Sequence, residues 1–281
     1  MKKIIILFSI LFLVSISHSG YKKPPWHFVD IWWQSNKPLP IFKSLSLDFT
    51  IHNHVPDNVK LYIAPVGWIE FNDRGAYAGI QTDLMKLVGR RRAKYVGQGL
   101  IFSRWKTRDL SATKVAPGGY NQSAGYEGDF VGVRNVFTWS IGKYTIGLKK
   151  THTQVIGGRY YSWVKMTVTE HRTGRVGNCG SIRFYGRNLK LKKSIASFVE
   201  IYGGSIPYYR IPRIKITFGN IKVNGTRAYN DYAYSSYPKN VPPYGTSYEN
   251  NGMVTVELGR RFSRQGLKST KTSYYKVHFS R

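Results

Sequence analysis

The sequence predicts an all-β protein, an antiparallel β-sandwich of the jelly-roll or lectin-like type with about ten to twelve strands. Three observations lead to this prediction. Apolar and polar residues alternate with a period of two in most segments from residue 44 onward, which is typical of strands with one buried face. Turn residues separate these segments at the spacing of a sandwich. No window of ten residues has the 3.6-residue period of an amphipathic helix, so one large β-domain over residues 44–281 is expected.

Residues 1–19 have the features of a signal peptide. Lys2 and Lys3 precede an apolar run over residues 4–14, and Ser17-His18-Ser19 provides small residues at a cleavage site. The apolar run is too short for a membrane span, which needs about 20 residues. No later segment is apolar enough to cross a bilayer. The mature protein is therefore expected to be secreted, either extracellular or periplasmic.

Residues 20–43 combine prolines with tryptophans: Pro24, Pro25, Pro38, Pro40, Trp26, Trp32 and Trp33. Proline lacks the N–H that a central strand donates to its neighbours. We therefore expect this segment to wrap across the sandwich, with its tryptophan side chains filling surface grooves.

The expected strands follow in order through the rest of the chain. Alternating runs occupy residues 45–51, 59–63, 77–82, 100–105, 131–141, 144–148, 160–168, 181–185, 195–201, 213–218, 254–258 and 275–279. Residues 224–251 break the pattern with six tyrosines among Asn, Ser, Gly and Pro, and are expected to form a long loop. Tyrosine presents a flat face and a hydroxyl, which suits sugar or protein recognition.

The run over 131–141 lies at the centre of this organisation. One face carries Val131, Val133, Phe137, Trp139 and Ile141, and the other carries Gly132, Arg134, Thr138 and Ser140. The apolar face predicts that Trp139 points into the core.

Four sequence blocks resemble a known family. They are YxGIQ at 77–81, IFSRW at 101–105, GYEGDF at 125–130 and WxxGxYT at 139–145. In this order they resemble a family of secreted, bacterial-type β-domains that is catalogued only as a domain of unknown function and whose members often accompany carbohydrate-active modules. The resemblance covers roughly residues 66–202. It implies a β-fold, and it carries no catalytic residue because the family has no established activity.

The charge of the chain is strongly positive. It has 43 Lys and Arg against 14 Asp and Glu, a formal net charge of +29 over 281 residues. Such a charge attracts polyanions, although it can also serve solubility alone. Arg90, Arg91 and Arg92 form the densest basic run. The partners expected are acidic or neutral polysaccharides, with extracellular nucleic acid as a further class because cations and aromatic rings occur together.

A ligand site is predicted around Trp105. This residue has the same parity as Ile101 and Ser103, a half-apolar face that could form the floor of a groove. Gln81 and Glu127 from neighbouring blocks could bind sugar hydroxyls there, and Arg90–Arg92 could bind acidic groups. The alternative is that Trp105 belongs to the core.

Glu127 and Asp129 are the one carboxylate pair within the family-like blocks. On an extended segment their Cα atoms would lie about 6–7 Å apart, within the range that glycosidases use. They also point the same way, whereas the carboxylates of a glycosidase lie on opposite sides of the substrate. Pairing with Arg134 or another basic residue is the commoner role for such a pair. No catalytic residue is assigned. A carbohydrate-binding protein is the leading hypothesis, followed by a polysaccharide-degrading enzyme using Glu127 and Asp129, and then by a structural or adhesive surface protein.

No cofactor is predicted. His52 and His54 share one face of an extended chain and are the only candidates for metal ligands, but no third ligand can be identified. The single cysteine, Cys179, excludes an intramolecular disulfide. Its Gly177–Gly180 neighbourhood predicts a turn. A monomer stabilised by its hydrophobic core is expected.

Overall fold

The computed structural model describes residues 21–88, 93–125, 128–227, 232–264, 267 and 274–279. These residues form β-strands and two 3₁₀ turns, Leu110–Ala112 and Tyr208–Arg210. The first sheet has nine strands, which are in spatial order β20 (Tyr274–Phe279), β17 (Tyr232–Pro238), β1 (Trp26–Gln34), β14 (Ser194–Ile201), β3 (Leu61–Phe71), β4 (Arg74–Gln81), β7 (Gly99–Trp105), β10 (Phe130–Val136) and β9 (Tyr120–Ala124).

The second sheet packs against the first. Its eight strands are in spatial order β18 (Gly245–Asn250), β19 (Met253–Leu258), β15 (Ile214–Val223), β2 (Ser44–Ile51), β11 (Gly142–Ile156), β12 (Arg159–Glu170), β13 (Val176–Tyr185) and β8 (Thr113–Val115). The short β16 (Thr226–Arg227) pairs with β15, and β5 (Met85–Leu87) pairs with β6 (Ala93–Tyr95) as a separate hairpin.

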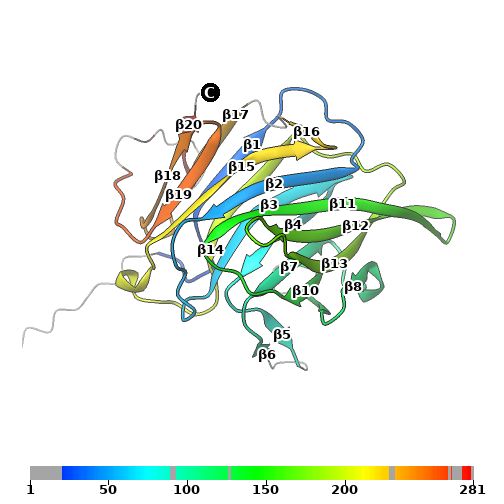
Figure 1. Cartoon of the computed structure of the whole chain (residues 1–281), viewed down its shortest axis with the longest axis horizontal. Coiled ribbons are helices and arrows are strands. Elements are labelled where there is room, and N and C mark those ends of the chain that lie inside the picture. Colours follow the sequence, from blue (N-terminus) through cyan, green and yellow to red (C-terminus); the bar gives the residue numbers. More distant parts are fainter. Residues whose placement is uncertain are drawn as a thin grey trace, which may run out of the picture.

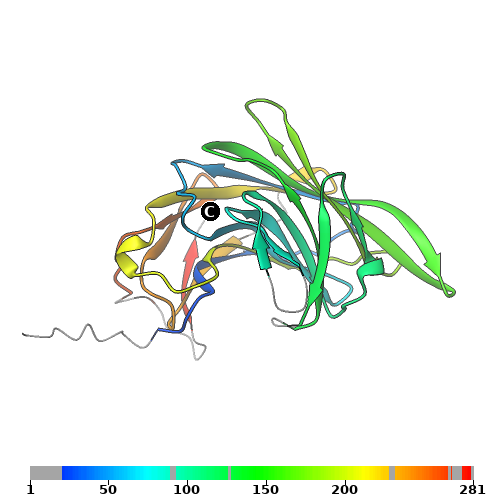
Figure 2. The ribbon, with the colours of Figure 1, turned by 90° about the horizontal axis from the view of Figure 1, so that it is seen from below.

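The predicted all-β antiparallel sandwich is confirmed, with more strands than the ten to twelve expected (Figure 1). The sheets are curved layers with the nine-stranded sheet on the inner, concave side (Figure 2). Alternate side chains of both sheets meet in one apolar core that includes Trp33, Phe49 and Phe102. The opposite face of the nine-stranded sheet is thereby left on the concave side of the molecule.

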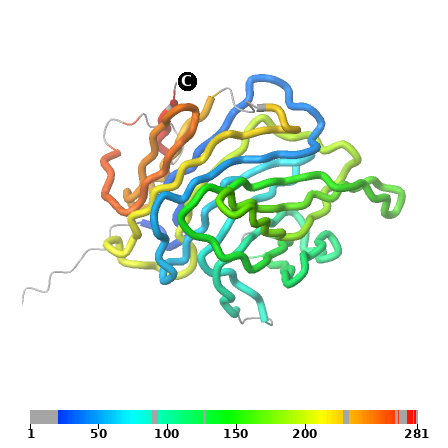
Figure 3. The backbone as a smooth tube through the Cα atoms, viewed as in Figure 1, coloured from blue at the N-terminus to red at the C-terminus, as the bar shows by residue number. Residues whose placement is uncertain are grey.

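Strands β11 and β12 form a long hairpin that extends beyond the body of the sandwich (Figure 3). The last residues before its turn lack core neighbours, and Val155 and Ile156 are exposed there. The body of the same hairpin contributes Tyr144, Ile146 and Leu148 to the core.

The expected wrap over residues 20–43 is wrong for its central part. Trp26–Gln34 is strand β1, paired with β14 on one side and β17 on the other. The prolines lie before and after the strand, so they remove none of its ladder hydrogen bonds. A bulge between His27 and Val29 shifts the alternation, which hides the period of two in the sequence.

The expected loop over residues 224–251 contains β17 and β18. Tyr237 is buried in the core, and Tyr234 stacks on Trp32 with ring centroids 6.4 Å apart. These two strands lack the branched aliphatic residues that mark most of the other strands. Tyrosine also favours a half-buried pleated surface, and here it forms the strand.

Cys179 lies in β13 rather than in a turn. Its thiol is fully buried and donates to the Val133 carbonyl oxygen at 3.2 Å. Trp139 is buried as predicted, whereas Ile141, expected on the same face, is exposed. The reason is that β10 ends at Val136 and residues 137–141 connect the two sheets.

Candidate functional site

A cavity of about 770 Å³ opens on the concave face of the nine-stranded sheet. This volume is within the range of small-molecule and cofactor sites. Its lining residues come from seven strands of that sheet, from the β5–β6 hairpin and from the segments beside them: Pro24, Pro25, His27, Asp30, Trp32, Tyr62, Gly67, Trp68, Tyr77, Gln81, Met85, Leu87, Ala93, Tyr95, Ile101, Trp105, Arg134, Ala196, Phe198, Glu200, Tyr202, Gly203 and Tyr274.

Strand register brings the polar residues of the cavity into rows. His27 of β1 pairs with Glu200 of β14, Glu200 with Tyr62 of β3, and Tyr62 with Gln81 of β4. Since residues opposite one another in a sheet point to the same face, these four side chains form a line across four strands. Their sequence neighbours point the other way, into the core.

A second row crosses the other half of the sheet. Tyr77 of β4 pairs with Ser103 of β7, Ser103 with Gly132 of β10, and Gly132 with Gln122 of β9. A side chain at Gly132 would collide with its neighbours, because a Cβ there would lie 2.3 Å from the Ser103 Oγ. The missing side chain lets the Ser103 hydroxyl and the Arg134 guanidinium pack directly over this strand.

Six rings follow one another along the cavity. The centroid separations are 5.1 Å for Trp68–Trp105, 4.7 Å for Trp105–Tyr77, 6.2 Å for Tyr77–Tyr62, 5.5 Å for Tyr62–Phe198 and 4.1 Å for Phe198–His27. We call these six residues the aromatic track. Gly79 allows β4 to pack closely against the Tyr62 ring of the track, since a Cβ at position 79 would lie 2.8 Å from that ring.

One end of the track carries a carboxylate–imidazole–carboxylate cluster. His27 Nδ1 lies 3.0 Å from Asp30 Oδ1, and His27 Nε2 lies 3.0 Å from Glu200 Oε2. Both oxygens accept, so both ring nitrogens must carry protons. Burial opposes the charge of the ring, but Asp30 and Glu200 outweigh it and raise the pKa of His27 to about 10. The cluster therefore has a net charge of −1 near neutral pH.

The other end carries a guanidinium. Arg134 of β10 lines the cavity and is only 3% exposed. The Gln122 side-chain amide is oriented so that its oxygen accepts from Arg134 Nη2 at 3.1 Å and its nitrogen donates to the Met85 carbonyl oxygen at 3.1 Å. The cavity thus has a negative end at β1 and β14 and a positive end at β10.

The predicted residues Gln81 and Trp105 both lie in this cavity. Trp105 is half-buried and packs against the apolar cluster of Tyr62, Tyr77 and Phe198. Of the two alternatives for Trp105, the structure places it on the cavity face. Its ring also forms part of the wall that supports Tyr77.

The other predicted site residues lie elsewhere. Arg90–Arg92 and Glu127 are outside the described residues, although β5 and β6 on either side of the arginines contribute Met85, Leu87, Ala93 and Tyr95 to the cavity. Asp129 has a 61% exposed side chain and pairs with Arg108 at 4.0 Å. It is not among the residues that line the cavity, so it does not join the site expected for it.

The candidate metal ligands are also placed apart from the cavity. His52 and His54 are exposed, and His52 Nε2 lies 2.7 Å from Thr217 Oγ1. Partial burial and the nearby Lys215 lower the pKa of His52. Within the described part of the chain no three His, Cys, Asp or Glu side chains come together as metal ligands.

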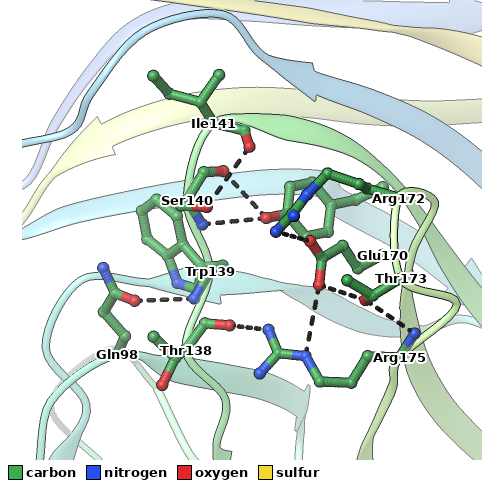
Figure 4. Close-up of polar contacts among 10 residues, drawn as sticks. Gln98, Thr138, Trp139, Ser140, Ile141, Glu170, Arg172, Thr173 and Arg175 are labelled. Carbon is green, nitrogen blue, oxygen red and sulfur yellow. Dashed lines mark hydrogen bonds and ion pairs between the residues drawn. The ribbon is translucent and has the colours of Figure 1, made fainter.

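The connection between β10 and β11 is held in place by a network of polar contacts (Figure 4). The Trp139 backbone N–H donates to Gln98 Oε1 at 2.9 Å, and its indole N–H donates to the Gln81 carbonyl oxygen at 3.2 Å. Nearby, Glu170 accepts from Thr173 at 2.8 Å and pairs with Arg172 and Arg175. These bonds, first of all the one from Thr173, lower the pKa of Glu170. Because every group here is paired within the network, we assign it a structural role.

Sequence reasoning missed His27, Asp30, Glu200 and Tyr62. Two of them lie on β1, which was expected to be a wrap, and the other two are single residues on separate strands. The available signal was parity: Glu200 alternates with the apolar Val199 and Ile201, so it must point away from the core. Only strand order brings it beside His27.

No protein-family model matches this chain, and no curated protein matches its sequence. The resemblance to the family of secreted β-domains therefore stays a prediction. Among the described residues no helix is long and apolar enough to span a membrane.

Proposed function

We propose that this protein is secreted and binds a polysaccharide in the cavity of the nine-stranded sheet. The observation that carries the proposal is the aromatic track. Sugar rings have apolar faces and hydroxyl edges, and a ligand of this kind needs flat apolar surfaces flanked by hydrogen-bonding groups. Trp68, Trp105 and Tyr77 supply the surfaces, while Gln81, Asp30 and Glu200 supply the polar groups beside them.

The charge of the chain supports an acidic partner. With a net charge of +29, the molecule attracts polyanions over distances set by the salt concentration. The cavity would then select among the polymers that this field concentrates at the surface.

The first test is Trp105→Ala. We expect it to remove most of the binding found on a glycan array, because a flat platform is lost. The free energy of unfolding should fall by about 1–2 kcal/mol, less than the 3–5 kcal/mol of a fully buried tryptophan. Binding is measured by calorimetry on the best array hit, and stability by urea denaturation.

The control is Tyr209→Ala, since Tyr209 is 81% exposed and is not among the residues that line the cavity. It should leave binding unchanged. Unaltered affinity in a folded Trp105→Ala variant would contradict the proposal.

A second candidate function is polysaccharide hydrolysis, with Asp30 and Glu200 in place of Glu127 and Asp129. Two carboxylates on either side of a bound sugar are what glycosidases use, and these two both lie in the cavity. In the observed arrangement both accept from His27, so the imidazole lies between the two carboxylates, where a glycosidase would hold its substrate. Binding is therefore favoured, and the release of new reducing ends, abolished by Glu200→Gln, would favour hydrolysis instead.

A further inference from the structure

Arg134 is a buried cation that forms no ion pair with a carboxylate of the described residues. It is 3% exposed, and none of the ion pairs formed among the described residues includes it. A guanidinium has five N–H donors, and the acceptor that the structure provides is the neutral amide of Gln122. Burying a charge is costly unless a partner compensates for it. Arg134 can therefore pair with an anion that enters the cavity.

The surroundings of Arg134 point to the cavity as the place of that anion. The guanidinium lies over Gly132, where a Cβ would come within 3.0 Å of Arg134 Nη1. The Tyr62 Oη, on the same face, is buried without a hydrogen-bond partner. Tyr62 and Arg134 both line the cavity, so a ligand bound there can contact both.

The charges at the two ends of the cavity give the ligand a direction. The pKa of Tyr62 is raised, chiefly by burial; the charge of Glu200 raises it further, and that of Arg134 lowers it. The charges at both ends of the cavity therefore act on the Tyr62 hydroxyl. An acidic group on a ligand is repelled by the cluster of Asp30, Glu200 and His27 and attracted by Arg134, so it is placed at the β10 end.

The length of the cavity indicates the size of the ligand. Strand β14, with Glu200, and strand β10, with Arg134, are four neighbours apart in the sheet, or roughly 19 Å at the spacing between strands. The aromatic track fills much of that span. A single sugar ring cannot reach from one end to the other, whereas an oligosaccharide can.

We propose that the cavity recognises a uronic-acid polysaccharide, with Arg134 pairing with the carboxylate of one sugar ring while neighbouring rings lie on the aromatic track. This inference rests on the proposed function and deepens it. A planar carboxylate fits the fork of a guanidinium with two parallel hydrogen bonds. Arg134 is then the residue that determines specificity for acidic over neutral sugars.

The test compares each acid with its own methyl ester. Oligomers of galacturonate, glucuronate and mannuronate are titrated beside the corresponding esters, which keep the ring and remove the charge. Titrations are made at 0.1 M and 1 M NaCl, because the Debye length falls from about 10 Å to 3 Å and surface cations are screened. We expect the wild type to prefer one of the acids at least tenfold over its ester, also at 1 M salt.

Arg134→Gln should reduce that preference to less than threefold while leaving the affinity for the ester within about threefold of wild type. The matched control is Arg159→Gln, which removes one charge from the exposed hairpin and should keep the preference at high salt. If Arg134→Gln does not fold, Arg134→Lys decides the question. It retains the charge without the fork and should lose at least part of the preference.

The outcomes separate the two proposals. Equal binding of acid and ester by the wild type, or an unchanged preference in Arg134→Gln, overturns the role of Arg134 and leaves glycan binding intact. A stronger response to sulfated than to uronic-acid oligomers also overturns it. The absence of binding to every oligomer, acid and ester alike, contradicts the proposed function and this inference with it.

Discussion

At the scale of single residues, the cavity joins two carboxylates through one protonated imidazole. His27 has a side chain that is 36% exposed, and it is held by Asp30 and Glu200 from two strands. Because the pKa of His27 is raised to about 10 from 6.5, its protonated form is favoured by folding. This stabilisation is fully present below pH 6.5 and is lost as the pH rises toward 10.

His27→Gln should therefore destabilise the protein most at low pH. We expect the loss in the free energy of unfolding to be about 2 kcal/mol at pH 6, since two partly screened hydrogen bonds to charged groups are removed. The difference from wild type should shrink between pH 6.5 and 10. Urea denaturation at pH 6, 8 and 10 measures it. A difference that stays constant would show that His27 is not protonated in the folded state.

Cys179 shows how burial changes the expectation for a single residue. From a turn position, Cys179→Ser would alter the stability by less than about 1 kcal/mol. In β13 the buried thiol lies among core side chains, so we now expect a loss of about 1–3 kcal/mol, since the serine hydroxyl buries a more polar group. Burial also raises the pKa of the thiol. Thermal denaturation measures the loss, and rapid labelling of Cys179 in the native protein would contradict its burial.

At the scale of elements, the hairpin of β5 and β6 forms one wall of the cavity. Its strands lie on either side of Arg90, Arg91 and Arg92 and place Met85 and Tyr95 against the ligand space.

Replacing Arg90, Arg91 and Arg92 by Ala should make the salt dependence of binding shallower. Each neutralised charge on a polyanion releases counterions, so the slope of log K against log salt should decrease by up to about two. The matched control replaces three exposed cations on and near the eight-stranded sheet, Lys149, Arg159 and Lys190. Titration of an acidic oligosaccharide at four salt concentrations measures both. An identical decrease in the two variants would mean that only net charge matters.

At the scale of the whole molecule, secretion is the remaining part of the proposed function. We expect the exported protein to lack residues 1–19, because the small residues Ser17 and Ser19 suit cleavage after position 19. The measurement is the intact mass of the protein recovered outside the cytoplasm, which should correspond to a chain beginning at Gly20. A mature protein that retains Met1 would contradict the prediction.

The sequence by itself determined the fold class and part of the site. Alternation assigned Trp139 to the core, and it placed Trp105 on the same face as Ile101, where the cavity lies. Composition determined the positive charge. These properties are local or additive: the direction of a side chain in a strand depends only on its parity, and net charge is a sum over residues.

The tertiary structure alone decided which strands are neighbours. His27 and Glu200 face each other because β1 pairs with β14, and Arg134 lies beside Gln122 because β10 pairs with β9. Register between distant strands depends on the packing of the whole core and on bulges such as the one in β1, which no local pattern reveals. A cavity whose two ends come from opposite halves of a sheet therefore exists only once that sheet is assembled.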